Sequence, residues 1–179
     1  MGYINSEDPY NSFYTEGEGF ISFLDNEANE ITSFSIGDYI SQAYRIKMFE
    51  NELYISGLTQ EALNYKMIKM SLEGDIIWHY EYGGSGSDHC FAMDMNEQGE
   101  IFLAGHTTSN TENWDVYTIK LNNEGEVIWE NKTGNPRGFN PLYIHDEAWG
   151  IKATNDGGCV TVAGTGDEYD NYSECNTNG

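Results

Sequence analysis

The chain has 179 residues, of which 39% are hydrophobic and 14% aromatic, enough to bury the core of one folded domain. A total of 30 Asp and Glu against 8 Lys and Arg gives a net charge of −22, which repels phosphate backbones and anionic lipid head groups. Nucleic acid is therefore not expected as a partner. Membrane insertion is not expected either, because no run approaches the roughly 18 apolar residues that span a bilayer.

The hydrophobic pattern predicts short strands and no helix, because alternating apolar residues recur between turn-forming residues and helical periodicity is not sustained anywhere. Glycine with Asn or Asp accepts positive φ, so the turns that contain Gly99 and Gly157 favour tight hairpins. The predicted strands lie, in chain order, within residues 20–32, 43–49, 51–59, 68–79, 89–95, 100–105, 115–121, 126–132, 148–154 and 157–165.

Two parts of this series are near-copies, IKMSLEGDIIWH (68–79) and IKLNNEGEVIWE (119–130), with FISFLDNEANEIT (20–32) as a degenerate third copy. A second motif, a short apolar run that ends in a small residue and glycine, alternates with the first in residues 51–59, 99–107 and 157–165. The two motifs together predict an antiparallel sheet of four strands and about 50 residues, which is the size of a β-propeller blade.

Lysine and tryptophan also recur in register, Lys69 with Lys120 and Trp78 with Trp129. A position that recurs in every unit indicates packing within the repeated scaffold, whereas an active site breaks the symmetry of the repeat. We therefore interpret these four side chains as structural.

The sequence thus predicts an all-β fold, one partial β-propeller domain over residues 1–179. Its units are a partial blade (1–37), two blades (38–84 and 85–134) and a second partial blade (135–179). That makes about three and a quarter antiparallel four-stranded blades, an incomplete ring, because propellers close with about four to eight blades. We expect unpaired edges at both ends and, as partners, either the remaining blades of a longer chain or a further copy of this one.

A pattern of small, acidic and apolar residues runs through most of the chain, formed by Asp146, Ala148, Ile151, Asp156–Gly158, Ala163–Thr165, Asp115, Tyr117, Ile119–Leu121, Gly125, Ile128, Trp129, Gly83 and Gly84. This pattern resembles bacterial β-propeller repeats of the SBBP type, and its closing Gly-x-x-x-Trp is similar to quinoprotein propeller repeats. The resemblance implies a propeller fold in a secreted or cell-surface protein, and it implies no reaction and no cofactor. The first ten residues lack the order of a secretory signal, so either the protein is cytosolic or this chain is a piece of a longer one. With the resemblance, we expect a fragment of an extracellular or surface protein.

In such a sheet the connections alternate between two ends, tight turns at one and long connections at the other. Long connections on a rigid scaffold are where binding groups usually lie. On that side Trp114, Tyr143, His145 and Trp149 are candidate platforms for a sugar ring or a protein ligand. The alternative for Trp149 is packing between blades.

The acidic C-terminal stretch holds Asp167, Glu168 and Asp170, oxygen ligands of the kind that bind Ca²⁺. The alternative is a solvated acidic loop, because the spacing is not that of an EF-hand. Cys159 and Cys175 could form a disulfide in a secreted protein, or remain thiols.

No catalytic motif such as HExxH, GxSxG or a P-loop is present, and no catalytic residue is assigned. The triplet His145–Glu147 could serve acid–base chemistry, but Asp146 matches Asp88 in the repeat, which favours a structural turn. We therefore expect a non-catalytic scaffold or binding module for a carbohydrate or protein. The alternatives are part of a propeller hydrolase or lyase that acts on polysaccharide, and a purely structural adhesin-like repeat.

Overall fold

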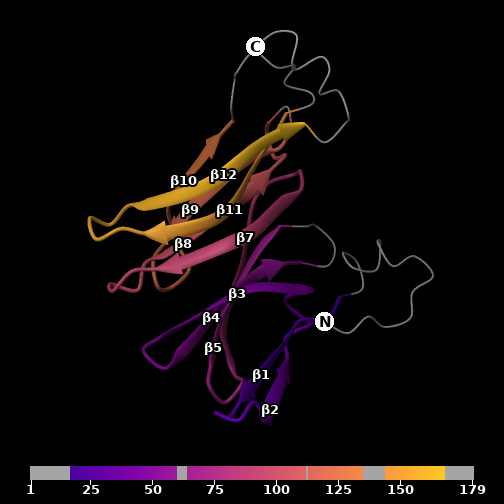
Figure 1. Ribbon diagram of the computed structural model, residues 1–179, viewed down its shortest axis with the longest axis vertical. Coiled ribbons are helices and arrows are strands. Elements are labelled where there is room, and N and C mark those ends of the chain that lie inside the picture. The colour runs from indigo at the N-terminus through magenta and orange to yellow at the C-terminus, as the bar shows by residue number, and fades with distance from the viewer. Residues whose placement is uncertain (1–16, 60–63, 112, 135–143, 168–179) are drawn as a thin grey trace, which may run out of the picture.

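The computed structural model describes residues 17–59, 64–111, 113–134 and 144–167, and these residues form twelve strands (Figure 1). In the described part of the chain no helix is long and apolar enough to cross a membrane. The strands are, in chain order, β1 (Phe20–Leu24), β2 (Glu30–Ser35), β3 (Gln42–Phe49), β4 (Glu52–Leu58), β5 (Tyr65–Ser71), β6 (Ile76–Tyr82), β7 (Asp88–Met95), β8 (Ile101–Thr107), β9 (Asp115–Leu121), β10 (Val127–Thr133), β11 (Ile144–Ala153) and β12 (Cys159–Asp167).

These strands form four antiparallel sheets in which each strand pairs with its neighbours in sequence. We call them sheet I (β1–β2), sheet II (β3–β4–β5–β6), sheet III (β7–β8–β9–β10) and sheet IV (β11–β12). The predicted all-β content and the four-stranded antiparallel sheets are confirmed. Residues 1–16 of the first partial blade (1–37) lie outside the described residues.

Sheets I and II lie toward one end of the long axis and sheets III and IV toward the other, where sheet IV overlaps sheet III in this view (Figure 1). Strand β7 contacts β3, β4 and β5 of sheet II, and β11 contacts β7, β8 and β9 of sheet III. The first strand of a sheet therefore packs across the first three strands of the preceding sheet, and this relation occurs twice.

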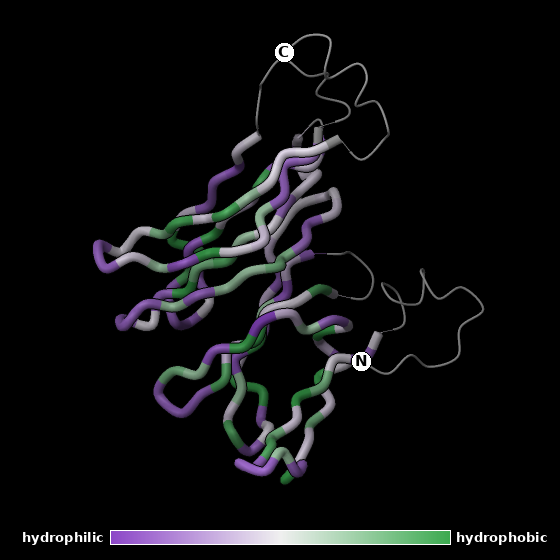
Figure 2. The backbone as a smooth tube through the Cα atoms, in the orientation of Figure 1, coloured by the Kyte–Doolittle hydropathy of each residue, from purple (hydrophilic) through white to green (hydrophobic). Residues whose placement is uncertain are grey.

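Buried apolar side chains of sheets II and III form one cluster. Hydrophilic residues concentrate at several of the turns (Figure 2). Between sheets II and III two buried tyrosines also donate hydrogen bonds to backbone carbonyls, Tyr65 to Tyr117 at 2.8 Å and Tyr82 to Gly125 at 2.8 Å. Each of these tyrosines thus buries its ring and satisfies its hydroxyl. The buried cluster between sheets III and IV is made of small residues, namely Ala92, Ala104 and Ala148.

One turn geometry joins the third and fourth strands of successive sheets. The side-chain oxygen of Asn122 accepts hydrogen bonds from the N–H groups of Glu124 and Glu126, and Gly125 then adopts a φ of 81°. In sheet I the same position is Ala28, with a φ of 65°. A side chain at positive φ is strained, so this turn is the least favourable of the series.

The recurring lysines form the same contact in both complete sheets. Lys69 pairs with Glu52 at 2.7 Å, and Lys120 pairs with Glu100 at 2.9 Å. Each ammonium also lies 5.3 Å from the centre of an aromatic ring on the second strand, that of Tyr54 or Phe102. The tryptophans Trp78 and Trp129 contact the same two rings. These repeated side chains therefore join strands within each sheet.

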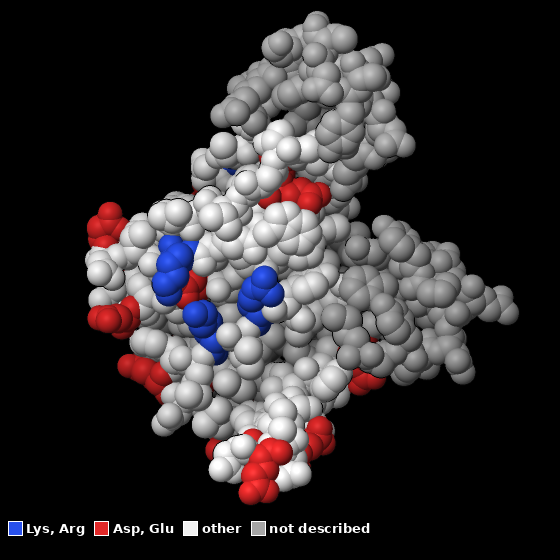
Figure 3. All heavy atoms as spheres, in the orientation of Figure 1, with Lys and Arg blue, Asp and Glu red and all other residues white. Residues whose placement is uncertain are grey.

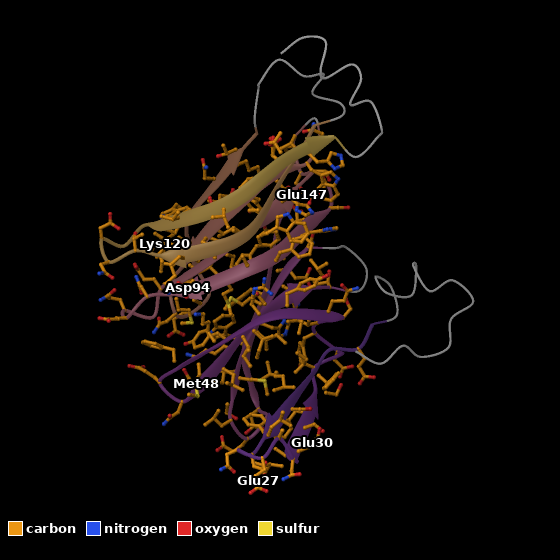
Figure 4. All side chains as sticks on the ribbon, in the orientation of Figure 1. Glu27, Glu30, Met48, Asp94, Lys120 and Glu147 are labelled. Atoms are coloured by element: carbon orange, nitrogen blue, oxygen red, sulfur yellow. The ribbon has the colours of Figure 1, made fainter. Side chains whose placement is uncertain are left out.

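A second ionic contact links three successive sheets at equivalent positions of their first strands. Asp94 on β7 accepts from Lys47 of sheet II and from Lys152 of sheet IV, both at 2.7 Å, and from the N–H of Ala153 at 2.9 Å. Burial raises the pKa of Asp94, but the hydrogen bonds from both lysines and from Ala153 outweigh it and hold that pKa well below its ordinary value. Figure 4 labels Asp94 near the turns of these sheets and Glu147 near the opposite end.

Candidate functional site

Each sheet has a turn end and a connection end. We call the second the connection end because it bears the segments between β4 and β5, β6 and β7, β8 and β9, and β10 and β11. Trp114 lies in the segment between β8 and β9, and His145 lies at the start of β11. Tyr143, a further candidate between β10 and β11, lies outside the described residues.

Four side chains meet at this end, and we call them the His–Trp cluster: His89, His106, Trp114 and His145. The ring centre of Trp114 lies 4.6 Å from that of His106, 4.9 Å from that of His89 and 6.3 Å from that of His145. His89 and His106 are directly opposite each other on β7 and β8, with ring centres 4.9 Å apart. The carbonyl of Trp114 accepts a hydrogen bond of 2.8 Å from the N–H of Asp146, which ties β11 to the cluster.

The cluster keeps two of its histidines, His89 and His106, neutral. His106 is 3% exposed and His145 is 7% exposed. Burial lowers the pKa of His106 to about 3, and the neighbouring His89 and His145 lower it further in the same direction. Burial also lowers the pKa of His89 to about 4, although the charge of Asp88 opposes this. At neutral pH both imidazoles are therefore uncharged donors and acceptors among apolar rings.

The cluster is not part of the repeat. In cross-strand register His89 is opposite His106, whereas the equivalent pairs are Gln42 opposite Leu58 in sheet II and Glu147 opposite Gly164 in sheet IV. Three of the chain's 4 histidines are gathered here. Sequence reasoning found Trp114 and His145 but missed His89 and His106. Their departure from the repeat is the signal that could have found them.

Trp149, by contrast, holds a repeated position. Its register equivalents are Tyr44 and Phe91, and each of the three residues is the extra residue of a β-bulge in the first strand of its sheet. A bulge re-aims a side chain, and here the three rings form a ladder across the sheets. Phe91 lies 5.1 Å from Tyr44 and stacks on Trp149 at 4.6 Å and 25°. Trp149 thus packs between sheets on one side, yet remains 53% exposed.

The carboxylates at the start of β7 and β11 are structural. Asp88 is fully buried and accepts hydrogen bonds from the hydroxyls of Thr107 and Ser109 and from the N–H of Gly84. Asp146 accepts from the hydroxyl of Thr165, the equivalent of Thr107. The Asp146 carboxylate therefore bridges β11 and β12, as expected of a residue that repeats.

The predicted calcium ligands lie at the border of the described chain. Asp167 ends β12, and Glu168 and Asp170 lie outside the described residues, so this site remains a prediction. Within the described ranges no three His, Cys, Asp or Glu side chains are arranged to hold a metal ion. Cys159 begins β12, and its predicted partner Cys175 also lies outside the described residues.

Comparison of the chain with protein-family models and with curated proteins gives no match. The likeness to SBBP-type repeats therefore rests on the motifs of the sequence alone. Function is argued below from the geometry of the connection end.

Proposed function

We propose that the chain is a series of consecutive β-propeller blades in an extracellular or surface protein, and that its connection end binds a carbohydrate without catalysis. Support for the propeller arrangement comes from the packing relation between sheets, which is the same from II to III as from III to IV. A rotation that repeats from blade to blade is what a propeller requires. Support for the extracellular setting is the motif resemblance.

The observation that carries the binding proposal is the His–Trp cluster itself. It brings an indole and three imidazoles from β7, β8, β11 and one connection to a single place. No equivalent group occurs at the other two register-matched pairs, so the rigid repeat does not need it. A group that departs from the repeat, at the end that bears the longer connections, is the best candidate for selection by a ligand.

The chemistry of the cluster suits a sugar. An indole offers a flat apolar face on which the C–H groups of a pyranose ring can pack, and the neutral imidazole of the partly exposed His89 offers a polar edge to its hydroxyls. The surrounding net charge of −22 disfavours anionic sugars. We therefore propose neutral or amino-sugar oligosaccharides, and not uronates or sulfated glycans, as the ligand class.

A glycan panel with wild-type chain, followed by calorimetric titration of each hit, tests the proposal. We expect Trp114→Ala to weaken binding by at least about tenfold, and Trp114→Phe, which keeps an aromatic face, to weaken it less. Trp129→Phe is the matched control, because Trp129 lies on β10, outside the His–Trp cluster, where it contacts Phe102. Equal affinity in wild type and Trp114→Ala for every glycan that binds would refute the proposed site.

The two alternatives differ from this proposal in a measurable way. Turnover of a bound glycan by the wild type, lost in His145→Ala, would indicate the hydrolase or lyase. An absence of binding to the whole panel would favour the adhesin-like repeat.

A further inference from the structure

The two ends of the described chain carry complementary halves of one sheet. Sheet IV has the register of a first and second strand, since Ala148 opposite Ala163 repeats Cys90 opposite Gly105. Sheet I has the register of a third and fourth strand, since its bulge at Ile31, between the pairs Leu24–Glu30 and Phe23–Thr32, repeats the bulge at Ile128 between β9 and β10. Within the described residues, β12 and β1 each pair with a strand on one edge only.

Sheet IV also exposes an apolar face that its equivalents bury. Val160 is 57% exposed and Val162 is 64% exposed. The equivalent residues of sheet III, Phe102 and Ala104, are both 0% exposed, because sheet IV packs on them. In sheet II the equivalent Tyr54 is 1% exposed. The exposed valines are therefore at positions that a following sheet covers elsewhere in this molecule.

A second apolar position that is exposed here but buried in its equivalent lies on β3, in sheet II. Ile46 is 52% exposed, whereas its equivalent on β7, Met93, is 5% exposed because the first strands of sheet II cover it. By the same relation, Ile46 would be covered by the first and second strands of the sheet that precedes sheet II. Those are the strands that sheet I lacks among the described residues and that sheet IV supplies.

We propose that two copies of this chain associate head to tail, with β12 of one copy pairing with β1 of the other. Val160 and Val162 of the first copy then cover Ile46 of the second. Two such junctions turn the four half sheets of the two copies into two complete sheets. Sheets II and III of both copies are four further complete sheets, and the total of six is within the range of closed propellers. This proposal rests on the propeller arrangement proposed above, but not on carbohydrate binding.

Electrostatics make the junction dependent on salt. Each copy carries a net charge of −22, so the copies repel each other at long range. The junction also brings Lys152, whose side chain is 75% exposed, toward Lys47, whose side chain is 42% exposed. Basic side chains are indeed grouped near the middle of the face in Figure 3, with acidic ones around its edge. Screening by salt weakens both repulsions and should favour the dimer.

Light scattering after size-exclusion chromatography tests the proposal. The wild type should have about twice the monomer mass of 20.2 kDa, with more dimer at about 0.5 M than at about 0.05 M salt. Val162→Lys should be a monomer with an unchanged far-UV spectrum, because Val162 is already exposed in the single chain. Val127→Lys is the matched control, since Val127 is 49% exposed on a complete sheet and should leave the dimer intact.

A mixing experiment tests the head-to-tail geometry. Val162→Lys and Ile46→Lys should each be monomeric alone, but their mixture should contain dimer, because one of its two junctions has wild-type residues on both sides. A wild type that stays monomeric and folded at both salt concentrations would overturn the proposal and favour further strands of a longer chain as the occupant. A dimer that Val162→Lys leaves intact would overturn it too. Glycan titration of the Val162→Lys monomer tests the His–Trp cluster separately.

Discussion

Replacing His106 by leucine should flatten the pH dependence of stability, and the size of the effect follows from the cluster. His106 is 3% exposed, and its pKa in the folded chain is lowered to about 3 from an ordinary value of 6.5. Below the ordinary pKa the unfolded chain binds a proton that the folded chain does not. Stability is therefore highest above about pH 6.5 and falls as the pH drops toward the folded pKa.

The expected magnitude at about pH 5 is about 2 kcal/mol for His106, since the unfolded imidazole is then protonated and the folded one is not. His89, with a pKa lowered to about 4, adds a loss of similar size in the same direction. Leucine is the natural replacement because the equivalent residue of sheet II is Leu58, which is fully buried. His106→Leu should thus lose about 2 kcal/mol less than wild type between about pH 7.5 and pH 5.

At neutral pH the variant should also be more stable by about 1 kcal/mol, because Nδ1 of His106 is buried without a hydrogen-bond partner among the described residues. Urea unfolding followed by far-UV circular dichroism at the two pH values measures both quantities. The other titrating groups are common to both chains and cancel in the difference. His79→Gln is the control, because His79 is the one histidine outside the cluster and is exposed on β6. Parallel losses of stability in wild type and His106→Leu would show the reasoning to be wrong.

Three further predictions concern the scaffold, all measured as free energies of unfolding in urea. Ala28→Gly should stabilise the chain by about 0.5–1 kcal/mol, because it relieves a side chain at a φ of 65°; an unchanged midpoint would contradict this. Gly105→Ala should destabilise by about 3 kcal/mol or more, because the new Cβ would overlap the carbonyl oxygen of His89, whereas Gly164→Ala, with no atom within 4 Å, should change little. Asp94→Asn should cost about 1–3 kcal/mol by weakening both lysine contacts, with the loss disappearing at acid pH as the wild-type carboxylate is protonated.

The sheets were predictable because they depend on local signals that the chain repeats. Alternating apolar residues and the Asn–Gly turn chemistry predicted strands at 115–121 and 126–132, and β9 and β10 lie at 115–121 and 127–133. The repeated Lys120 was correctly interpreted as structural, since it joins Glu100 and the ring of Phe102. Such contacts join strands that are neighbours in sequence, so periodicity contains nearly all the information they need.

The His–Trp cluster was only half predictable because it depends on how sheets III and IV pack. His89 and His145 are brought near one ring by the placement of β11 across β7 and β8, a contact between distant parts of the chain that no local pattern specifies. The bulge at Phe91 adds one residue to β7 and shifts its register against β8, so the pairing of His89 with His106 could not be counted from the sequence.

Repetition nevertheless gives a rule for separating packing residues from binding residues once the register is known. Trp149 and Trp114 are both partly exposed tryptophans near His106, and exposure alone does not distinguish them. The bulge position of Trp149 is aromatic in all three first strands, so the scaffold itself requires a ring there. The repeat provides no such explanation for the contacts of Trp114, because the histidines around it are replaced by other residues in the equivalent pairs. The position of Trp114 beside these histidines is therefore the feature that the repeated packing explains least.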